Sequence, residues 1–396
     1  MFPGMKRLGA WARVAIVAAL PLAMGALSCT TNHDALAKQP KAGSGGGGGA
    51  AGAVAGGGFG NTGDVPSQGG RINPDQELPG DDVLTIVNGV IDAPSVALCF
   101  GWLSPDGQDS ELVGSPSAEL EYGHHAVLTE LEELSFEADA IVPWVIAGDL
   151  SLLDGLDCEA AVALALDEEA SVTPEEPAEP EGAAGAGGAG SEPEPDPLPL
   201  PALRARALAA IPAGTVAIGR SILMVLTGCI GGAAFTDSVE RAACGPDYTP
   251  STPTLEPLVV KMSRKYAFEK VGLQAVLASP SVNGTIDVRA AEEGSLLLTF
   301  ASDVSFGNIE PRPADVRYGP LDLGVTTRRH GLEAVDDNGV LFEQKWPRIF
   351  QASGVSELVA ARNYTAVLLG PNPRLAKDGF WNASTFALVE SDPTRD

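Results

Sequence analysis

The sequence predicts an all-β protein that consists of two antiparallel β-sandwich modules. Short apolar stretches rich in β-branched residues recur about every eight to fifteen residues, with Pro or Gly between them, a pattern typical of antiparallel sheets. A Pro-Ser-Val turn follows the opening strand of each half. Two segments with almost nothing to bury, one near the N-terminus and one in the middle of the chain, predict disordered connections.

The expected strands divide between residues 80–263 and residues 264–396. In the first module they are Val83–Val90, Ser95–Leu103, Ile141–Ala147, Leu203–Ile211, Val216–Thr227 and Leu255–Met262. In the second module they are Leu273–Leu277, Gly284–Arg289, Ser295–Phe300, Leu332–Val335, Val340–Gln344, Asn363–Leu369 and Thr385–Val389. The stretch Leu156–Glu169 is compatible with a helix instead, because Ala, Leu and Glu favour helices.

The clearest local signal is a hairpin at Val335–Val340. Its Asn338-Gly339 pair tolerates the positive φ angles that a tight turn requires. Asp336 and Asp337 are adjacent, whereas calcium ligands alternate along a loop, and no carboxylate follows at the closing position. We therefore expect a turn here and no calcium site.

Short motifs recur at matching places in the two modules. Asp92–Val96 and Ala278–Val282 each link two strand candidates. Proline fixes φ in such a turn, and Ser or Asp side chains bond to nearby backbone amides. Late in each module a strand ends at glycine, at Trp144–Gly148 and at Tyr364–Gly370. These matches predict two related modules.

The same motifs resemble an uncharacterised family of exported bacterial proteins, domain of unknown function 4397, whose members are often tandem. The family pattern is a strand, an Ala-Ser-Pro-like turn and a second strand, with a tyrosine-led strand that closes at glycine. Ala278–Arg289 and Asn363–Gly370 fit it, whereas the first module keeps the Pro-Ser-Val turn but departs through its acidic insertion and cysteines. The resemblance implies an immunoglobulin-like sandwich in each module and no known activity.

The N-terminus has the composition of an export signal. Positive Lys6, Arg7 and Arg13 precede the apolar stretch Val14–Leu27. About fourteen apolar residues are too few to cross a hydrocarbon core of about 30 Å comfortably. We therefore expect residues 1–28 to be a cleaved signal peptide rather than a membrane span.

Cys29 closes this leader in the sequence Ala26-Leu27-Ser28-Cys29, which resembles the cleavage box of bacterial lipoproteins. The resemblance implies that Cys29 is acylated, becomes the new N-terminus and anchors the protein in a membrane of the cell envelope. A secretory signal without lipid is the alternative, since Ala26 and Leu27 depart from the usual residues. Thr30, where an aspartate would retain a lipoprotein at the inner membrane, implies the outer membrane.

Two low-complexity segments flank and interrupt the first module. Residues 29–79 are rich in Gly, Ala and Ser and include the run Gly43–Gly49, which predicts a flexible tether. Residues 167–201 combine acidic residues with Pro and Gly and contain no Lys or Arg. This composition predicts an acidic, disordered insertion.

The chain is strongly acidic, with 25 Lys and Arg against 52 Asp and Glu and a net charge of −27. Such a surface repels phosphate, which excludes nucleic acid as an expected partner. It also disfavours anionic lipid head groups, so the membrane anchor must hold without a basic patch.

An even number of cysteines remains once Cys29 is set aside, which indicates disulfides in an exported chain. Cys229 and Cys244 are close in sequence, and we expect them to pair. Cys99 and Cys158 then pair by elimination, although four cysteines allow three pairings.

The sequence offers few groups for catalysis. The four histidines are His33, His124, His125 and His330. Adjacent side chains on a strand point to opposite faces, so His124 and His125 would not share a metal ion. Ser221 lies outside a Gly-x-Ser-x-Gly nucleophile motif and is interpreted as a strand residue. We expect no cofactor, no metal and no enzymatic activity.

Trp346 and Trp381 are the candidate ligand contacts. An exposed indole can lie against a sugar ring, and the surrounding Lys345-Trp346-Pro347-Arg348 is polar. The alternative is that these tryptophans anchor the core of a sandwich.

These observations predict an exported, lipid-anchored envelope protein with a binding, adhesion or structural role. Its expected partners are the membrane, through the anchor, and an envelope protein or a glycan. One alternative is an envelope hydrolase that acts on polysaccharide or peptide through carboxylates not identified by any motif. A solute-binding protein is a third hypothesis, disfavoured because it requires two α/β lobes.

Overall fold

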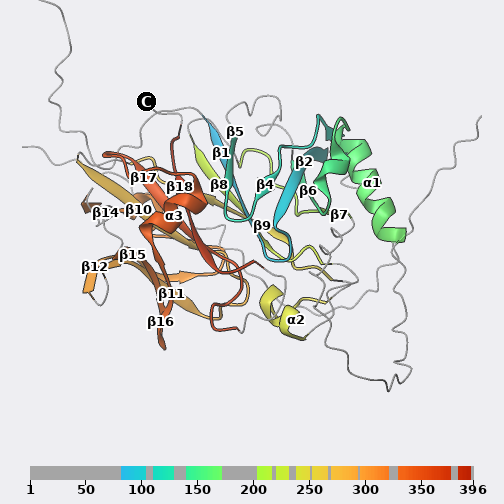
Figure 1. Cartoon of the computed structure of the whole chain (residues 1–396). Helices are drawn as coiled ribbons and strands as arrows, with labels where there is room; N and C mark the ends of the chain where they lie inside the picture. The colour runs from blue at the N-terminus through green and yellow to red at the C-terminus, as the bar shows by residue number, and fades with distance from the viewer. Residues whose placement is uncertain are drawn as a thin grey trace, which may run out of the picture. The chain divides into compact units, whose positions relative to one another are not determined.

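The described strands of each half form two β-sheets (Figure 1). In the first half one sheet has the order β5-β1-β8-β9 and the other the order β3-β2-β6-β7, with β4 paired to β2. The strands are β1 (Val83–Val90), β2 (Ser95–Leu103), β3 (Ser110–Val113), β4 (Leu120–Glu121), β5 (His125–Leu128), β6 (Ile141–Ala147), β7 (Arg204–Ala207), β8 (Ser221–Gly228) and β9 (Glu256–Lys261). The computed structural model describes residues 82–103, 110–128, 140–171, 203–215, 220–231, 238–249, 252–265, 269–292, 295–320, 329–375 and 382–393.

The second half repeats this strand order. Its sheets run β13-β10-β17-β18, with β14 paired to β10, and β12-β11-β15-β16. The strands are β10 (Lys270–Leu277), β11 (Thr285–Glu292), β12 (Ser295–Ser305), β13 (Ile309–Glu310), β14 (Arg317–Pro320), β15 (His330–Asp336), β16 (Gly339–Lys345), β17 (Asn363–Leu369) and β18 (Thr385–Glu390). The prediction of an all-β sandwich protein is confirmed.

The repeat makes β8 the counterpart of β17. The expected match of Trp144–Gly148 with Tyr364–Gly370 is therefore wrong, because β6 pairs with β2 whereas β17 pairs with β10. Gly228, which ends β8, and Gly370, which follows β17, have φ angles of +89° and +90°. These angles favour glycine at both positions.

Two strand pairs are parallel, which differs from the expected purely antiparallel sheets. β1 runs parallel to β8, and β10 runs parallel to β17. Between β1 and β8 the chain crosses to the other sheet, returns as β5 and crosses again as β6 and β7. β10 and β17 are likewise separated by strands of both sheets. All eight residues of β1 and of β8 are buried, as is usual for parallel strands covered on both faces.

Three apolar cores lie between the sheets. One fills the first half and another fills the second half. The third joins the halves, since β1 and β8 supply Val87, Leu223 and Val225 while β10 and β17 supply Val276 and Val367. Alternate residues of β8 thus face the core of the first half and the core between the halves. In keeping with this shared core, residues Gly69–Asp396 form one compact unit.

Helix α1 (Cys158–Ser171) packs on the outer face of the β2-β6-β7 sheet. The helical interpretation of Leu156–Glu169 is confirmed, and the helix takes up the first residues of the expected insertion 167–201; residues 172–201 lie outside the described residues. The face it covers is apolar, with Ala97, Ile146 and Ala205 buried. None of the described helices combines the length and the apolar composition needed to span a membrane.

The connection between the halves, Ser263–Lys265, is buried although all three residues are polar. The backbone N of Ser263 donates to Gln274 Oε1 at 2.8 Å. Arg264 Nε donates to Ser221 Oγ at 2.6 Å, and Lys265 Nζ donates to the Ala314 carbonyl at 2.8 Å. This linker is therefore fixed to both halves.

The hairpin predicted at Val335–Val340 joins β15 to β16. Its turn residues are Asp337 and Asn338, and the positive φ falls on Gly339, at +104°. The Asn338 N–H donates to Asp336 Oδ1 at 2.8 Å. The register shifts next to Val335, as in hairpins where a glycine bulge follows the turn.

Candidate functional site

The candidate ligand contact Trp346 is wrong, because the structure buries it. Trp346 begins helix α3 (Trp346–Ser353), is 0% exposed and belongs to the core of the second half. Its ring stacks on Phe350 with centroids 5.5 Å apart. The polar residues next to Trp346 in the sequence suggested an exposed side chain. In the helix, Trp346 and Ile349 face the core while Arg348 stays exposed. Trp381 lies outside the described residues.

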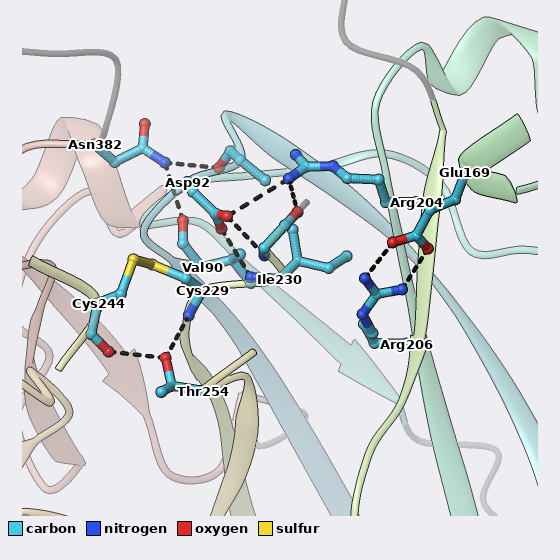
Figure 2. Close-up of polar contacts among 12 residues, drawn as sticks. Val90, Asp92, Glu169, Arg204, Arg206, Cys229, Ile230, Cys244, Thr254 and Asn382 are labelled. Carbon is cyan, nitrogen blue, oxygen red and sulfur yellow. Dashed lines mark hydrogen bonds and ion pairs between the residues drawn. A yellow bond between two sulfur atoms is a disulfide. The ribbon is translucent and has the colours of Figure 1, made fainter. Parts of the chain in front are cut away.

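A buried ion pair lies beside the first Pro-Ser-Val turn (Figure 2). Asp92 Oδ2 and Arg204 Nη1 are 3.5 Å apart, with side chains 2% and 7% exposed. Asp92 also accepts hydrogen bonds of 2.9 Å from the backbone N–H groups of Ile230 and Gly231. Arg204 Nη1 donates to the Gly231 carbonyl.

Burial raises the pKa of Asp92, whereas Arg204 and the two backbone N–H groups act to lower it. Burial likewise lowers the pKa of Arg204, against the attraction of Asp92. The carboxylate is engaged by groups of the protein itself and is closed to solvent, which leaves no room for a substrate. The pair cross-links the β1–β2 turn, β7 and the segment after β8. The Ile230 and Gly231 amides that donate to Asp92 are distant from it in sequence.

Asn382, in the second half, forms three hydrogen bonds to the same turn. Asn382 Nδ2 donates to the carbonyls of Val90 and Ala93, at 3.0 and 2.6 Å (Figure 2). The Asn382 N–H donates to the Ile91 carbonyl at 2.8 Å. The turn is thus held from both halves and is a structural element rather than a mobile loop.

Both predicted disulfide pairings are confirmed. Cys99 on β2 bonds to Cys158 at the start of α1, and Cys229 bonds to Cys244 at the end of helix α2 (Ser238–Cys244), with Cα–Cα distances of 5.6 and 5.4 Å. Thr254 Oγ1 joins the second bridge, because it accepts from the Cys229 N–H and donates to the Cys244 carbonyl (Figure 2). Cys29 lies outside the described residues.

The C-terminal end of α1 is tied to β7. Glu169 forms an ion pair with Arg206 (Figure 2), and Glu168 Oε2 accepts from the Leu203 N–H at 2.8 Å. The Arg206 guanidinium lowers the pKa of Glu169. The described residues on either side of 172–202 are therefore held together.

The described histidines do not converge. His124 Nε2 lies 3.6 Å from Glu121 Oε2, and His330 Nε2 lies 3.2 Å from Glu292 Oε2. Burial, together with neighbouring His124, lowers the pKa of His125. Within the described ranges, no three His, Cys, Asp or Glu side chains are grouped so that they could hold a metal ion. His33 lies outside those ranges.

An open groove of about 720 Å³ lies beside the start of α1 and is the candidate contact surface. We call it the serine-acid groove. It is lined by Ala97, Ser115, Pro116, Ser117, Ala118, Glu119, Leu150, Ser151, Leu153, Asp154, Gly155, Leu156 and Asp157. These residues come mainly from the segment between β3 and β4 and from the 150–157 segment, which includes the 3₁₀ helix η3 (Leu150–Leu153).

The groove is hydroxylic and acidic. The described residues that line it include three serines and three carboxylates, and none of them is Lys, Arg or His. Three of these groups also have local structural roles: Ser117 Oγ accepts from the Leu98 N–H, Ser151 Oγ donates to Asp149 Oδ1, and Asp157 Oδ1 accepts from the Ala160 N–H. The Cys99–Cys158 disulfide fixes one wall to β2. Sequence reasoning missed this site because its residues match no motif and converge only after α1 packs on the sheet.

No family model matches the chain, and no curated protein matches it either. The resemblance to domain of unknown function 4397 therefore stays a prediction.

Proposed function

We propose that this protein is an exported envelope lipoprotein, anchored through Cys29, that presents a rigid β-sandwich stack as a binding module without catalysis. The serine-acid groove is its contact surface, and a glycan is its partner. The observation that carries this proposal is the groove itself, which is large enough for a small ligand. The buried linker and the two disulfides support a preformed surface.

The chemistry of the lining favours a hydroxyl-rich ligand. Ser115 supplies a hydroxyl that donates and accepts, and Ser151 Oγ, whose proton goes to Asp149, supplies an acceptor. Glu119 and Asp154 supply further acceptors for sugar hydroxyls. Leu156 and Pro116 provide apolar surface beside them. An acidic wall disfavours phosphate and sulfate esters, so neutral or amino sugars are the expected class.

The test is a glycan-binding screen on the full mature chain, with E119Q/D154N as the groove variant. D337N, on the exposed hairpin turn of the second half, is the matched control. We expect binding of a neutral or amino-sugar glycan that the groove variant loses and the control keeps. Binding unaffected by E119Q/D154N, or no glycan binding at all, would contradict the proposal.

Anchorage is tested separately. Mass spectrometry of the mature N-terminus, compared with a C29S variant, measures whether Cys29 carries acyl chains. We expect an acylated Cys29 in the membrane fraction and release of C29S from it. An unacylated, cleaved N-terminus would support the secretory alternative and leave the groove assignment intact.

A hydrolase is the second candidate function, because Glu119 and Asp154 line one groove together. Two carboxylates on either side of a glycosidic bond are the usual machinery for its hydrolysis. Release of reducing ends from envelope polysaccharide, abolished by E119Q, would favour this candidate over simple binding.

We also propose that both halves descend from a domain related to domain of unknown function 4397. The supporting observation is the shared strand order, in which β1, β2, β6 and β8 correspond to β10, β11, β15 and β17. A family alignment that matches Ala278–Arg289 and Asn363–Gly370 but places them on strands that do not pair in this order would contradict it.

A further inference from the structure

Asparagine followed by glycine occurs three times, at Asn88, Asn283 and Asn338. Such a pair is chemically labile, because glycine has no Cβ to hinder the approach of its backbone nitrogen to the asparagine side chain. Local sequence is therefore similar at the three sites, and the fold decides which of them can react.

Asn88 is held on both sides of its amide. Its Nδ2 donates to the Leu120 carbonyl at 2.9 Å, and its Oδ1 accepts from the Val90 N–H at 3.0 Å. The residue is buried within β1. A Cβ on Gly89 would lie 2.7 Å from the Leu226 carbonyl oxygen, so the backbone has no space in which to rearrange.

Asn338 is exposed but lies in a constrained turn. Its N–H donates to Asp336 Oδ1 at 2.8 Å, and Gly339 is a strand residue paired with Asp336. Arg374 forms an ion pair with the same aspartate and lowers its pKa to about 2. The main chain on both sides of Asn338 is thereby fixed.

Asn283 differs from both. It lies between β10 and β11, outside any strand, and both Asn283 and Gly284 are exposed. Gly284 has φ +86°, and no atom lies within 4 Å of the position its Cβ would occupy, which is also true of Gly339. The difference from Asn338 is that Gly284 lies outside any strand, whereas Gly339 is paired with Asp336. An exposed connection outside strand pairing leaves the main chain free to take up the geometry that the reaction requires.

We propose that Asn283 is a site of spontaneous deamidation in the folded protein. The Gly284 nitrogen attacks Asn283 Cγ, the new N–Cγ bond forms, the Cγ–NH2 bond breaks, and ammonia leaves with the proton from the Gly284 amide. Water then opens the succinimide. Cleavage of the N–Cγ bond gives aspartate, and cleavage of the bond from the Gly284 nitrogen to the Asn283 main-chain carbonyl carbon gives isoaspartate.

The product changes a connection that contacts another segment. Ser281, in the same connection, accepts a 2.7 Å hydrogen bond at Oγ from the Asn372 N–H. Deamidation adds a negative charge two residues away from this contact, and the isoaspartate form also adds a methylene group to the main chain. Because the reaction is spontaneous, the deamidated form of Asn283 accumulates with time at this surface position.

The experiment incubates the purified full chain at physiological temperature and mildly alkaline pH and maps the three sites by peptide mass spectrometry with isoaspartate detection. A parallel sample is incubated unfolded in urea. We expect Asn283 to react about ten-fold faster or more than Asn88 and Asn338 in the folded protein, since local structure suppresses opening, and the three rates to converge in urea. N283Q should abolish the isoaspartate signal.

Equal rates at the three sites in the folded protein would overturn the proposal, and so would an unchanged Asn283. Asn283-Gly284-Thr285 also matches the acceptor motif for N-glycosylation. A glycan on Asn283 of the protein recovered from its native source would remove the reactive amide and likewise overturn the proposal.

Discussion

The Nε atom of Arg264, in the linker between the halves, donates a 2.6 Å hydrogen bond to Oγ of Ser221 at the start of β8. The Arg264 Nη2 group reaches the Arg220 carbonyl at 3.4 Å. A buried guanidinium therefore ties the linker to the first half, where a solvated linker would have left the halves free to rotate.

Replacing Arg264 with Ala should destabilise the protein by about 1–3 kcal/mol, since it removes charge-assisted bonds and leaves buried acceptors without a donor. Urea denaturation measures the change. R348A, at an exposed position of α3, is the control and should change the free energy of unfolding little. Equal effects of the two substitutions would contradict the role assigned to Arg264.

The buried pair Asp92–Arg204 should show strong coupling. D92A or R204A alone leaves an uncompensated buried charge and should cost about 3–5 kcal/mol. The double variant should cost clearly less than the sum of the single variants. A double-mutant cycle in urea measures the coupling, with D337N as an exposed carboxylate control. Additive losses would indicate that the two charges do not interact.

The two disulfides should differ in their contribution. Their bridges close loops of 59 and 15 residues, and in the chain-entropy account their loss costs about 4 and about 3 kcal/mol respectively. C99S/C158S and C229S/C244S, compared by thermal unfolding at equal protein concentration, measure this order. A larger loss for the shorter loop would show that native contacts around Cys229, and not chain entropy, dominate.

Trp346 should behave as a core residue and not as a ligand contact. W346A removes a fully buried indole and should destabilise the protein by about 3–5 kcal/mol. W346F should recover part of that loss. L297A, which truncates an exposed side chain of β12, is the control. A stable W346A protein that has only lost glycan binding would restore the ligand interpretation.

His125 should make stability depend on pH. Its folded pKa lies below the ordinary value, so as pH falls below about 6.5 the unfolded chain takes up the proton first and the folded state loses stability. The stability that neutral His125 contributes is fully lost once the pH lies below the pKa of His125 in the folded protein. H125Q should flatten the curve of unfolding free energy in that window. H124Q removes only the smaller influence of the neighbouring His124 on His125 and should flatten the curve less.

The strand predictions succeeded where short-range chemistry decides the structure. Four strands have the bounds expected from their apolar runs, namely β1, β2, β6 and β17. The Asn338-Gly339 pair correctly predicted the hairpin between β15 and β16. Short strands such as β3, β4 and β13 were missed, because a two- to four-residue strand is fixed by its partner and not by its own pattern.

The sequence by itself determined the all-β class and the presence of disulfides, because hydrophobic periodicity and an even cysteine count can be interpreted without the fold. It allowed a helix at Leu156–Glu169 and favoured Cys229–Cys244 among three possible pairings, and the structure decided both. Tertiary structure alone decided the parallel pairing of β1 with β8, the burial of Trp346 and the linkage of Asp92 to Arg204. Each of these features depends on which strand faces meet after the chain crosses between sheets. Asp92 and Arg204 are 112 positions apart along the chain, and the residues around each of them do not indicate their contact.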